Sequence, residues 1–208
     1  MPHLALLGDA ILANRAHTTP KPDTATILRE RLSGWTVTLL AAPGTTIASV
    51  QFQLQNLPAD VDLVVLSVGG NDAIKHVDIL QQPARSSADT LDNLLTIIDE
   101  FSGEYDGVVQ AVRGRVNRLV LCTIYEAPLV GENTARRASV VLTLLNDQIL
   151  RIAGNRSSDV LDLRAVCTSR GDFVMQISPS ATGAEKIADA IARAASGSGG
   201  RRVTVIAG

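Results

Sequence analysis

Short apolar runs alternate with longer segments of mixed polarity from one end of the chain to the other. Most residues of each short run are Val, Leu, Ile or Ala, which is typical of a strand buried on both faces. Turn-forming residues follow several runs, such as Gly8 after the first and Pro43 after the second. The pattern predicts five strands, at residues 3–7, 36–41, 62–68, 118–124 and 159–163.

The longer segments have apolar residues at the three- and four-residue spacing of amphipathic helices. They predict helices at residues 24–33, 46–57, 88–113, 134–153 and 180–195. Asp23 is expected to cap the first of these helices. The inward face of the third is expected to carry Leu91, Leu94, Leu95 and Ile98. That of the fourth is expected to carry Val140, Val141, Leu144, Leu145 and Ile149.

The third predicted helix is less regular in its second half, because Gly103 and Gly107 interrupt its apolar pattern. Strands and helices nevertheless alternate along the whole chain, which indicates a parallel sheet covered by helices on both faces. The predicted fold class is α/β, a three-layer α/β/α sandwich with a flavodoxin-like five-stranded parallel sheet. Ligands of such sheets bind beyond the carboxyl ends of the strands. The segments to examine for a site are therefore 8–17, 42–46, 69–76, 125–132 and 164–178.

Composition narrows this picture only slightly. The 208 residues, 46% of them hydrophobic, suit one domain over 1–195, followed at 196–208 by a Gly/Ser linker and a short strand or disordered tail. The formal net charge is −2 and is spread evenly, which favours neither a nucleic-acid nor a membrane partner. The two cysteines are expected to be free thiols, and the protein is expected to be soluble and cytoplasmic.

Four short motifs stand at the predicted strand ends and before the last helix. They are Gly8-Asp9-Ala10-Ile11-Leu12, Gly44, Gly69-Gly70-Asn71-Asp72 and Met175-Gln176-Ile177-Ser178-Pro179-Ser180. Their order and spacing resemble the SGNH (GDSL-type) hydrolases, a family of serine esterases, lipases and related acyl hydrolases. The family's blocks read Gly-Asp-Ser-(Leu/Ile), a central glycine, Gly-x-Asn-Asp and Asp-x-x-His. The resemblance extends from Leu4 to about Ala194.

The resemblance implies a set of catalytic roles. In the family the serine attacks a carbonyl, the histidine accepts its proton, and the aspartate orients the histidine. The chain has Ala10, Ser178 and Met175 at the matching positions, so it resembles a degenerate member. The oxyanion donors are retained, because the Ala10 backbone amide, Gly44 and Asn71 are all present. Asp9 is expected to keep the family's structural role of bonding to the loop backbone.

Other polar residues of these segments are candidates to replace the missing groups. Asp172, His76 and His17 are candidate acids or bases, although Asp172 can equally cap a turn and the histidines can equally lie at the surface. Tyr125 and Glu126 follow the fourth strand and are candidate ligand contacts, as is Ser178. No pattern typical of a metal site or a phosphate-binding loop is present, so no cofactor is expected.

Three functions fit these residues. The first is a protein that no longer hydrolyses esters but binds a small acyl, ester or carboxylate ligand at Asp9, Ala10, Gly44 and Asn71. The second is a serine-independent enzyme that cyclises, eliminates or dehydrates a carbonyl substrate by general acid–base chemistry. The third is a GDSL esterase whose nucleophilic serine was changed to alanine by engineering, which the absence of Asp and His at 175 and 178 disfavours.

Overall fold

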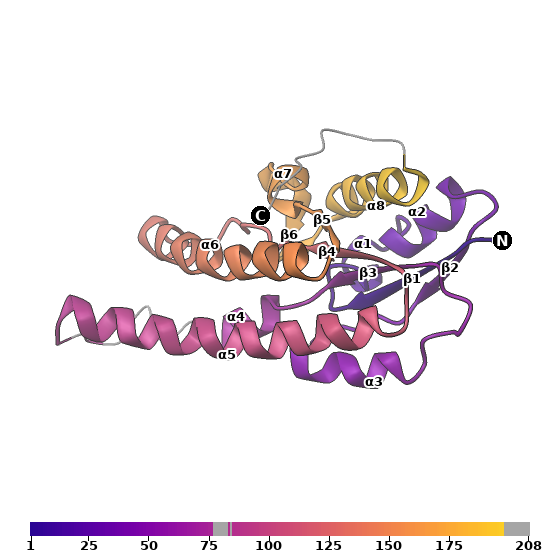
Figure 1. Ribbon diagram of the computed structural model, residues 1–208. Coiled ribbons are helices and arrows are strands. Elements are labelled where there is room, and N and C mark those ends of the chain that lie inside the picture. Colours follow the sequence, from indigo (N-terminus) through magenta and orange to yellow (C-terminus); the bar gives the residue numbers. More distant parts are fainter. Residues whose placement is uncertain (77–82, 84, 198–208) are drawn as a thin grey trace.

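The computed structural model describes residues 1–76, 83 and 85–197 and contains a parallel five-stranded sheet (Figure 1). The strands are β1 (His3–Gly8), β2 (Thr36–Leu39), β3 (Leu63–Ser67), β4 (Arg118–Cys122) and β5 (Asp159–Leu161). Their order in the sheet is β2-β1-β3-β4-β5, and every neighbouring pair is parallel. The five strands and the flavodoxin-like fold class predicted from the sequence are confirmed.

Helices cover both faces of the sheet (Figure 1). One face packs against α3 (Val50–Leu54), α5 (Ser87–Arg113) and α6 (Glu132–Asn155). The other packs against α2 (Thr24–Arg31), α7 (Leu163–Val166) and α8 (Ala181–Ser196). The short helices α1 (Arg15–Thr18) and α4 (Gly70–Lys75) follow β1 and β3, and single 3-10 turns occur at Ile47–Ser49 and Arg170–Asp172. A two-stranded antiparallel hairpin joins β6 (Phe173–Val174) and β7 (Ser178–Pro179).

Alternating side chains of each strand enter opposite sides of the core. In β1, Ala5 and Leu7 pack toward α3 and α5, while Leu4 and Leu6 pack toward α2 and α8. All of β1 is buried, and so is all of β3. A strand buried on both faces needs an apolar residue at every position, which explains the continuous apolar runs of the sequence.

The inward face predicted for α5 is wrong in part, because Leu94 and Ile98 are half-buried but Leu91 and Leu95 are not. Leu91 is 59% exposed and Leu95 is exposed as well, whereas the buried side chains of the helix are Ile97, Phe101, Tyr105, Val109 and Val112. The physical reason is that the first turns of α5 extend past the edge of the sheet, where there is no strand for them to cover (Figure 1). Gly103 and Gly107 do not interrupt the helix, which is continuous over 27 residues.

A similar overhang explains a smaller error in α6. Leu145 and Ile149 are buried as predicted, but Val140 is 59% exposed, because the first turns of this helix also extend beyond the sheet (Figure 1). At α2 the predicted cap is confirmed, since the Thr26 amide donates to the Asp23 carboxylate at 2.8 Å. Cys122 and Cys167 are both buried free thiols.

The expected C-terminal tail falls mostly at residues 198–208, outside the described residues. Within the described part of the chain, α8 ends at Ser196. No helix among those described is long and apolar enough to cross a bilayer.

Candidate functional site

A cavity of about 560 Å³ opens beyond the carboxyl ends of β1, β3 and β4. We call its first side the N-terminal wall, formed by Asp9–Ile11 and by Gly70, Asn71, Ala73, Ile74 and His76 from α4 and its C-terminal end. The C-terminal wall, Ile177–Pro179, belongs to the hairpin. The α6 wall consists of Ile124–Ala127, Leu129 and the first turns of α6. The cavity therefore lies where a parallel sheet of this topology is expected to bind ligands.

The N-terminal wall begins at a position that only glycine can occupy. Gly8 has a φ of +121°, and a Cβ added to it would lie 1.8 Å from the Ser67 backbone oxygen. The Gln53 side chain holds the Gly8 backbone at both ends: its Oε1 accepts the Gly8 amide at 2.8 Å and its Nε2 donates to the Gly8 oxygen at 2.9 Å. The Asp9 amide then donates to the Ser67 oxygen at 3.0 Å. These contacts fix the chain at the point where Ala10 enters the cavity wall.

Asn71 is held in a similar way. Its Nδ2 donates to the Thr45 backbone oxygen at 2.8 Å, and the amide group has a second hydrogen that this bond does not use. The neighbouring Asp72 is buried and accepts the Ile47 amide at 3.0 Å, which ties α4 to the loop after β2. Gly44, the predicted third donor, lies in that loop with a φ of +78°, but it is exposed and is not part of the cavity wall.

Asp9 is the buried acid of the N-terminal wall, with only 3% of its surface exposed. The Ile11 amide donates to its Oδ1 at 3.0 Å, as the structural role expected for this residue requires. Burial raises the pKa of Asp9 to about 7; the Ile11 hydrogen bond opposes the shift, and the nearby Asp72 adds to it. Asp9 is therefore a carboxyl group that gains or loses its proton near neutral pH.

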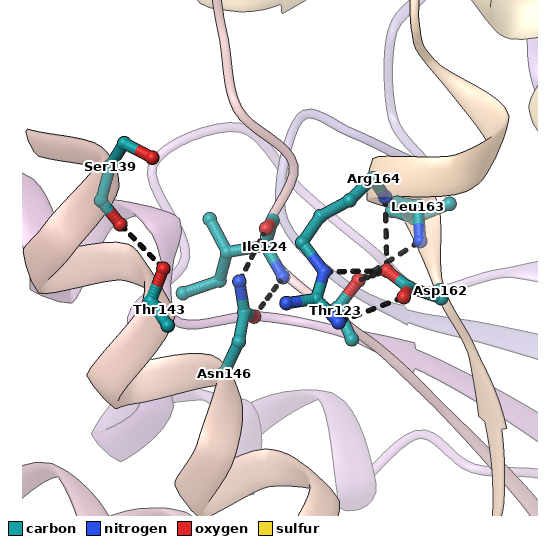
Figure 2. Close-up of polar contacts among 8 residues, drawn as sticks. All are labelled: Thr123, Ile124, Ser139, Thr143, Asn146, Asp162, Leu163 and Arg164. Carbon is teal, nitrogen blue, oxygen red and sulfur yellow. Dashed lines mark hydrogen bonds and ion pairs between the residues drawn. The ribbon is translucent and has the colours of Figure 1, made fainter. Parts of the chain in front are cut away.

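The α6 wall is fixed by a second amide side chain (Figure 2). Asn146 of α6 accepts the Ile124 amide through Oδ1 and donates to the Ile124 oxygen through Nδ2, both at 2.8 Å. Beside it, Thr123 donates to Asp162 at 2.8 Å and accepts the Leu163 amide at 2.9 Å (Figure 2). These bonds connect the ends of β4 and β5 and position Tyr125 and Glu126.

Tyr125 connects the α6 wall to the hairpin. It is buried, its hydroxyl donates to the Ile177 oxygen at 2.6 Å, and its ring packs edge-on against Phe173 with centroids 4.9 Å apart. Tyr125 and Glu126 both line the cavity, and Glu126 is exposed at its rim, while their contact with a ligand stays a prediction.

The C-terminal wall has no charged side chain of its own. Ser178 lines the cavity and pairs with Val174 across the hairpin. The turn of the hairpin places Met175 and Gln176 in the left-handed region, with φ of 49° and 70°. The Met175 side chain is 79% exposed, so it points to solvent rather than toward Ser178.

Asp172, a candidate acid or base, lies outside the cavity wall and has several partners. It is 1% exposed, pairs with Lys186 at 2.8 Å and accepts the Ser169 amide at 2.9 Å. Burial alone would raise the pKa of Asp172, but the hydrogen bonds from Lys186 and Ser169 outweigh it and lower that pKa. The backbone of Asp172 also packs closely against α8, because a Cβ added to Gly183 would lie 2.2 Å from the backbone oxygen of Asp172. This geometry gives Asp172 the capping role that the sequence left open.

The two candidate histidines differ in position. His76 ends α4 and lines the cavity, half-buried. His17 lies in α1, also half-buried, and is not part of the wall that the described residues form. The structure thus brings together Asp9, Ala10, Asn71, His76, Tyr125, Glu126 and Ser178, and leaves Gly44, His17 and Asp172 outside.

Sequence reasoning missed the contribution of α6. Its cavity-lining residues are Ala135, Arg136, Ala138, Ser139, Val141 and Leu142. A signal was available, because Ala135, Ala138 and Ser139 place small side chains three and four residues apart on one face of the predicted helix. Arg136 adds an exposed cation to this wall.

Comparison with known proteins agrees with the fold and the motifs. The family model described as the GDSL-like lipase/acylhydrolase family matches residues 6–201. The fold and site define an α/β protein of the SGNH-hydrolase type, and the chain belongs to the GDSL-like lipase/acylhydrolase family. A search of curated proteins gave no match.

Several solved structures share the fold at low sequence identity. An extracellular lipase from Streptomyces rimosus has a TM-score of 0.69 and 14% identity, with 92% of this chain and 98% of that chain covered. Phospholipase A1 from Streptomyces albidoflavus NA297 has a TM-score of 0.70 and 18% identity, with 91% and 98% covered. The acetylxylan esterase Axe2 from Geobacillus stearothermophilus has a TM-score of 0.65 and 16% identity, with 92% and 93% covered.

Proposed function

We propose that this chain is a degenerate GDSL-family protein that binds a small acyl, ester or carboxylate ligand and does not perform serine-dependent ester hydrolysis. The observation that carries the proposal is the cavity itself. It contains Ala10 and Ser178 at the positions that resemble the family's nucleophile and base, beside Asn71, which resembles its oxyanion donor. Binding donors are retained while the groups that attack a carbonyl and move its proton are replaced.

The chemistry of these replacements argues against hydrolysis. An alanine methyl group cannot attack a carbonyl, and a serine hydroxyl is no base near neutral pH. Loss of the nucleophile or base of a serine triad costs about 10⁶-fold in turnover. The nearest buried aspartate of the C-terminal side, Asp172, is held by Lys186 and does not reach the cavity wall.

The rest of the cavity suits an acyl compound. Ile74, Ile124, Leu129, Val141 and Leu142 make most of the α6 wall and its junction with α4 apolar. Asn71 lies on the opposite side as a donor for a carbonyl or carboxylate oxygen. Ligand cavities in proteins typically combine such an apolar lining with a few polar groups that fix orientation. The named activities of the similar structures, lipase, phospholipase A1 and acetylxylan esterase, point to an ester or its acid as the ligand class.

A second candidate function is favoured by one specific observation. Asp9 and His76 line the same cavity, so a carboxyl group and an imidazole are both available to one ligand. A serine-independent elimination or dehydration needs a base and an acid placed in this way. Loss of water from 3-hydroxyhexanoate, followed by NMR, is the test of this second candidate. Turnover that Asp9→Asn abolishes would support it over simple binding.

Ligand binding tests the main proposal directly. Hexanoate and hexanamide should each raise the melting temperature, and calorimetry should give a dissociation constant for both. Asn71→Ala should abolish these effects, whereas Asn93→Ala, an exposed asparagine on α5, should leave them unchanged. Absence of stabilisation by acids, amides and esters of two to eight carbons would contradict the proposal.

A further inference from the structure

We propose that the side chain of Asp9 is protonated when it binds a carboxylate ligand, so that Asp9 and the ligand share one proton in the complex. This inference rests on the proposed function and assigns the chemical state in which the site binds its ligand. The proton comes from solvent and enters with the ligand, and no covalent bond forms or breaks.

The position of Asp9 carries the inference. It lines the cavity between Ala10 and the start of α4, where Gly70 and Asn71 form the adjoining surface. Its Oδ1 accepts the Ile11 amide, and its Oδ2 lies 3.7 Å from the site that a Cβ on Gly70 would occupy. Oδ2 therefore lies close to Gly70, which precedes Asn71 in the cavity wall. In the proposed complex the ligand carboxylate binds to the Ala10 amide and Asn71 and lies against this oxygen.

The surroundings of Asp9 supply no positive charge to it. Asp72 on α4 faces it as a second carboxylate, and Lys75 pairs with Asp72 rather than with Asp9. The other titratable groups near it are the Tyr105 hydroxyl of α5, the Cys122 thiol of β4 and the Tyr125 hydroxyl. Within the described part of the chain, no lysine or arginine forms an ion pair with Asp9.

The state of Tyr105 agrees with a weakly polar environment. Its hydroxyl is the one buried side-chain oxygen or nitrogen of the described residues that has no hydrogen-bond partner. Burial raises the pKa of Tyr105 well above its usual range, with smaller contributions from Cys122 and Asp9. An ionised Asp9 is thus stabilised mainly by backbone hydrogen bonds, of which the one from Ile11 has the largest effect. A second anion at this place requires that one of the two carboxyl groups hold a proton.

The consequence is a pH dependence that differs between an acid and its amide. The pKa of Asp9 in the free protein is raised to about 7 by burial, so Asp9 is mostly protonated at pH 6 and mostly ionised at pH 8. If only the protonated form binds hexanoate, its dissociation constant should increase about tenfold between pH 6 and pH 8. Hexanamide carries no charge and needs no proton, so its dissociation constant should change less than about twofold.

Two variants separate the effect of Asp9 from that of His76. Asparagine has the shape of a protonated aspartate, so Asp9→Asn should bind hexanoate at pH 8 as tightly as the unmodified protein does at pH 6. His76 lines the same cavity and brings an imidazole, a side chain that can act as an acid or a base, to it. The tenfold effect should persist in His76→Gln. Its loss in His76→Gln would overturn the assignment to Asp9.

A measurement on the unmodified protein keeps the inference testable if Asp9→Asn does not fold. Calorimetry of hexanoate binding in two buffers of different ionisation enthalpy counts the protons taken up. About one proton per ligand is expected at pH 8 and almost none at pH 6. No uptake at pH 8 would overturn the inference. Equal, pH-independent binding of hexanoate and hexanamide would refute it while leaving the proposed function intact, whereas absence of binding by both at every pH would refute the proposed function.

Discussion

Two buried aspartates on opposite sides of the cavity are in opposite electrostatic states. Asp9, on the N-terminal wall, accepts the Ile11 amide and forms no ion pair with the cations of the described residues, and burial raises its pKa to about 7. Asp172, behind the C-terminal wall, is equally inaccessible, yet its pKa is lowered because Lys186 and the Ser169 amide outweigh the effect of burial. One carboxyl is poised to exchange a proton at the cavity, and the other is a fixed anion that joins a loop to α8.

The difference between the two aspartates extends to the other groups on the two sides of the cavity. The N-terminal wall keeps closely constrained backbone at Gly8 and the amide of Asn71, both held by hydrogen bonds to neighbouring loops. On the C-terminal side, Asp172 has a structural role because it pairs with Lys186. The hairpin on this side offers the hydroxyl of Ser178 to the cavity. The N-terminal side of the cavity thus presents the amide of Asn71 on a constrained backbone, and the C-terminal side presents the hydroxyl of Ser178.

The largest predicted effect concerns the constraint of the N-terminal wall. Gly8→Ala should lower the free energy of unfolding by about 4 kcal/mol or more, because the new Cβ meets the Ser67 oxygen at 1.8 Å in a backbone conformation that suits glycine. Urea denaturation is the measurement. Gly103→Ala is the matched control: nothing lies within 4 Å of that Cβ, and the change should stabilise α5 by about 0.5–1 kcal/mol.

The second prediction tests the charge state of Asp9 through stability. A folded-state pKa raised from 3.8 to about 7 means that the folded protein holds this proton more tightly than the unfolded chain does. The contribution of Asp9 to the free energy of unfolding is therefore fully present below about pH 4 and is lost as the pH rises to about 7. The loss is at most about 4 kcal/mol, at 1.36 kcal/mol per pKa unit. Asp9→Asn should remove this decline, and a variant that is no more stable than the parent protein at pH 8 would contradict the assignment.

The third prediction concerns Asp172 and has the opposite sign. Its lowered pKa means that its contribution is present at neutral pH and is lost as the pH falls through the folded-state value, below about 4. Asp172→Asn should cost about 2 kcal/mol at pH 7, since Lys186 is partly exposed and solvent weakens the pair. The deficit should shrink in acid, and hexanoate affinity should stay within about twofold. A large loss of affinity in a folded Asp172→Asn would place this residue in the binding chemistry.

The smallest predicted effect concerns the α6 wall. Ala138→Trp should fill part of the cavity and weaken hexanoate binding about tenfold, which corresponds to about 1.4 kcal/mol. Val140→Trp is the matched control, because Val140 lies on the same helix but points to solvent. Equal affinities for the two variants, measured by calorimetry, would mean that the ligand does not extend along α6.

The sheet was predictable because a doubly covered parallel strand imposes an apolar residue at each position, as in Leu4–Leu7. The overhang of α5 was not, because Leu91 and Leu95 have helical spacing whether or not a strand lies beneath them. Of the site, Asp9, Ala10, Asn71, Tyr125, Glu126 and Ser178 were expected at the cavity, since they directly follow strands or precede the last helix. The partner of Asp172 was not foreseeable, because Lys186 lies fourteen residues away and meets it only after α8 packs.

The central claim is that the cavity binds acyl compounds without serine chemistry. Hydrolysis of p-nitrophenyl butyrate by the unmodified protein and by Ala10→Ser, side by side at pH 6 to 8, tests it most directly. Both should remain at the rate of the buffer alone, because Ser178 offers no base and Asp172 is held by Lys186. Robust turnover by Ala10→Ser alone would contradict the account, since it would mean that a working base faces position 10 and that only the nucleophile is missing.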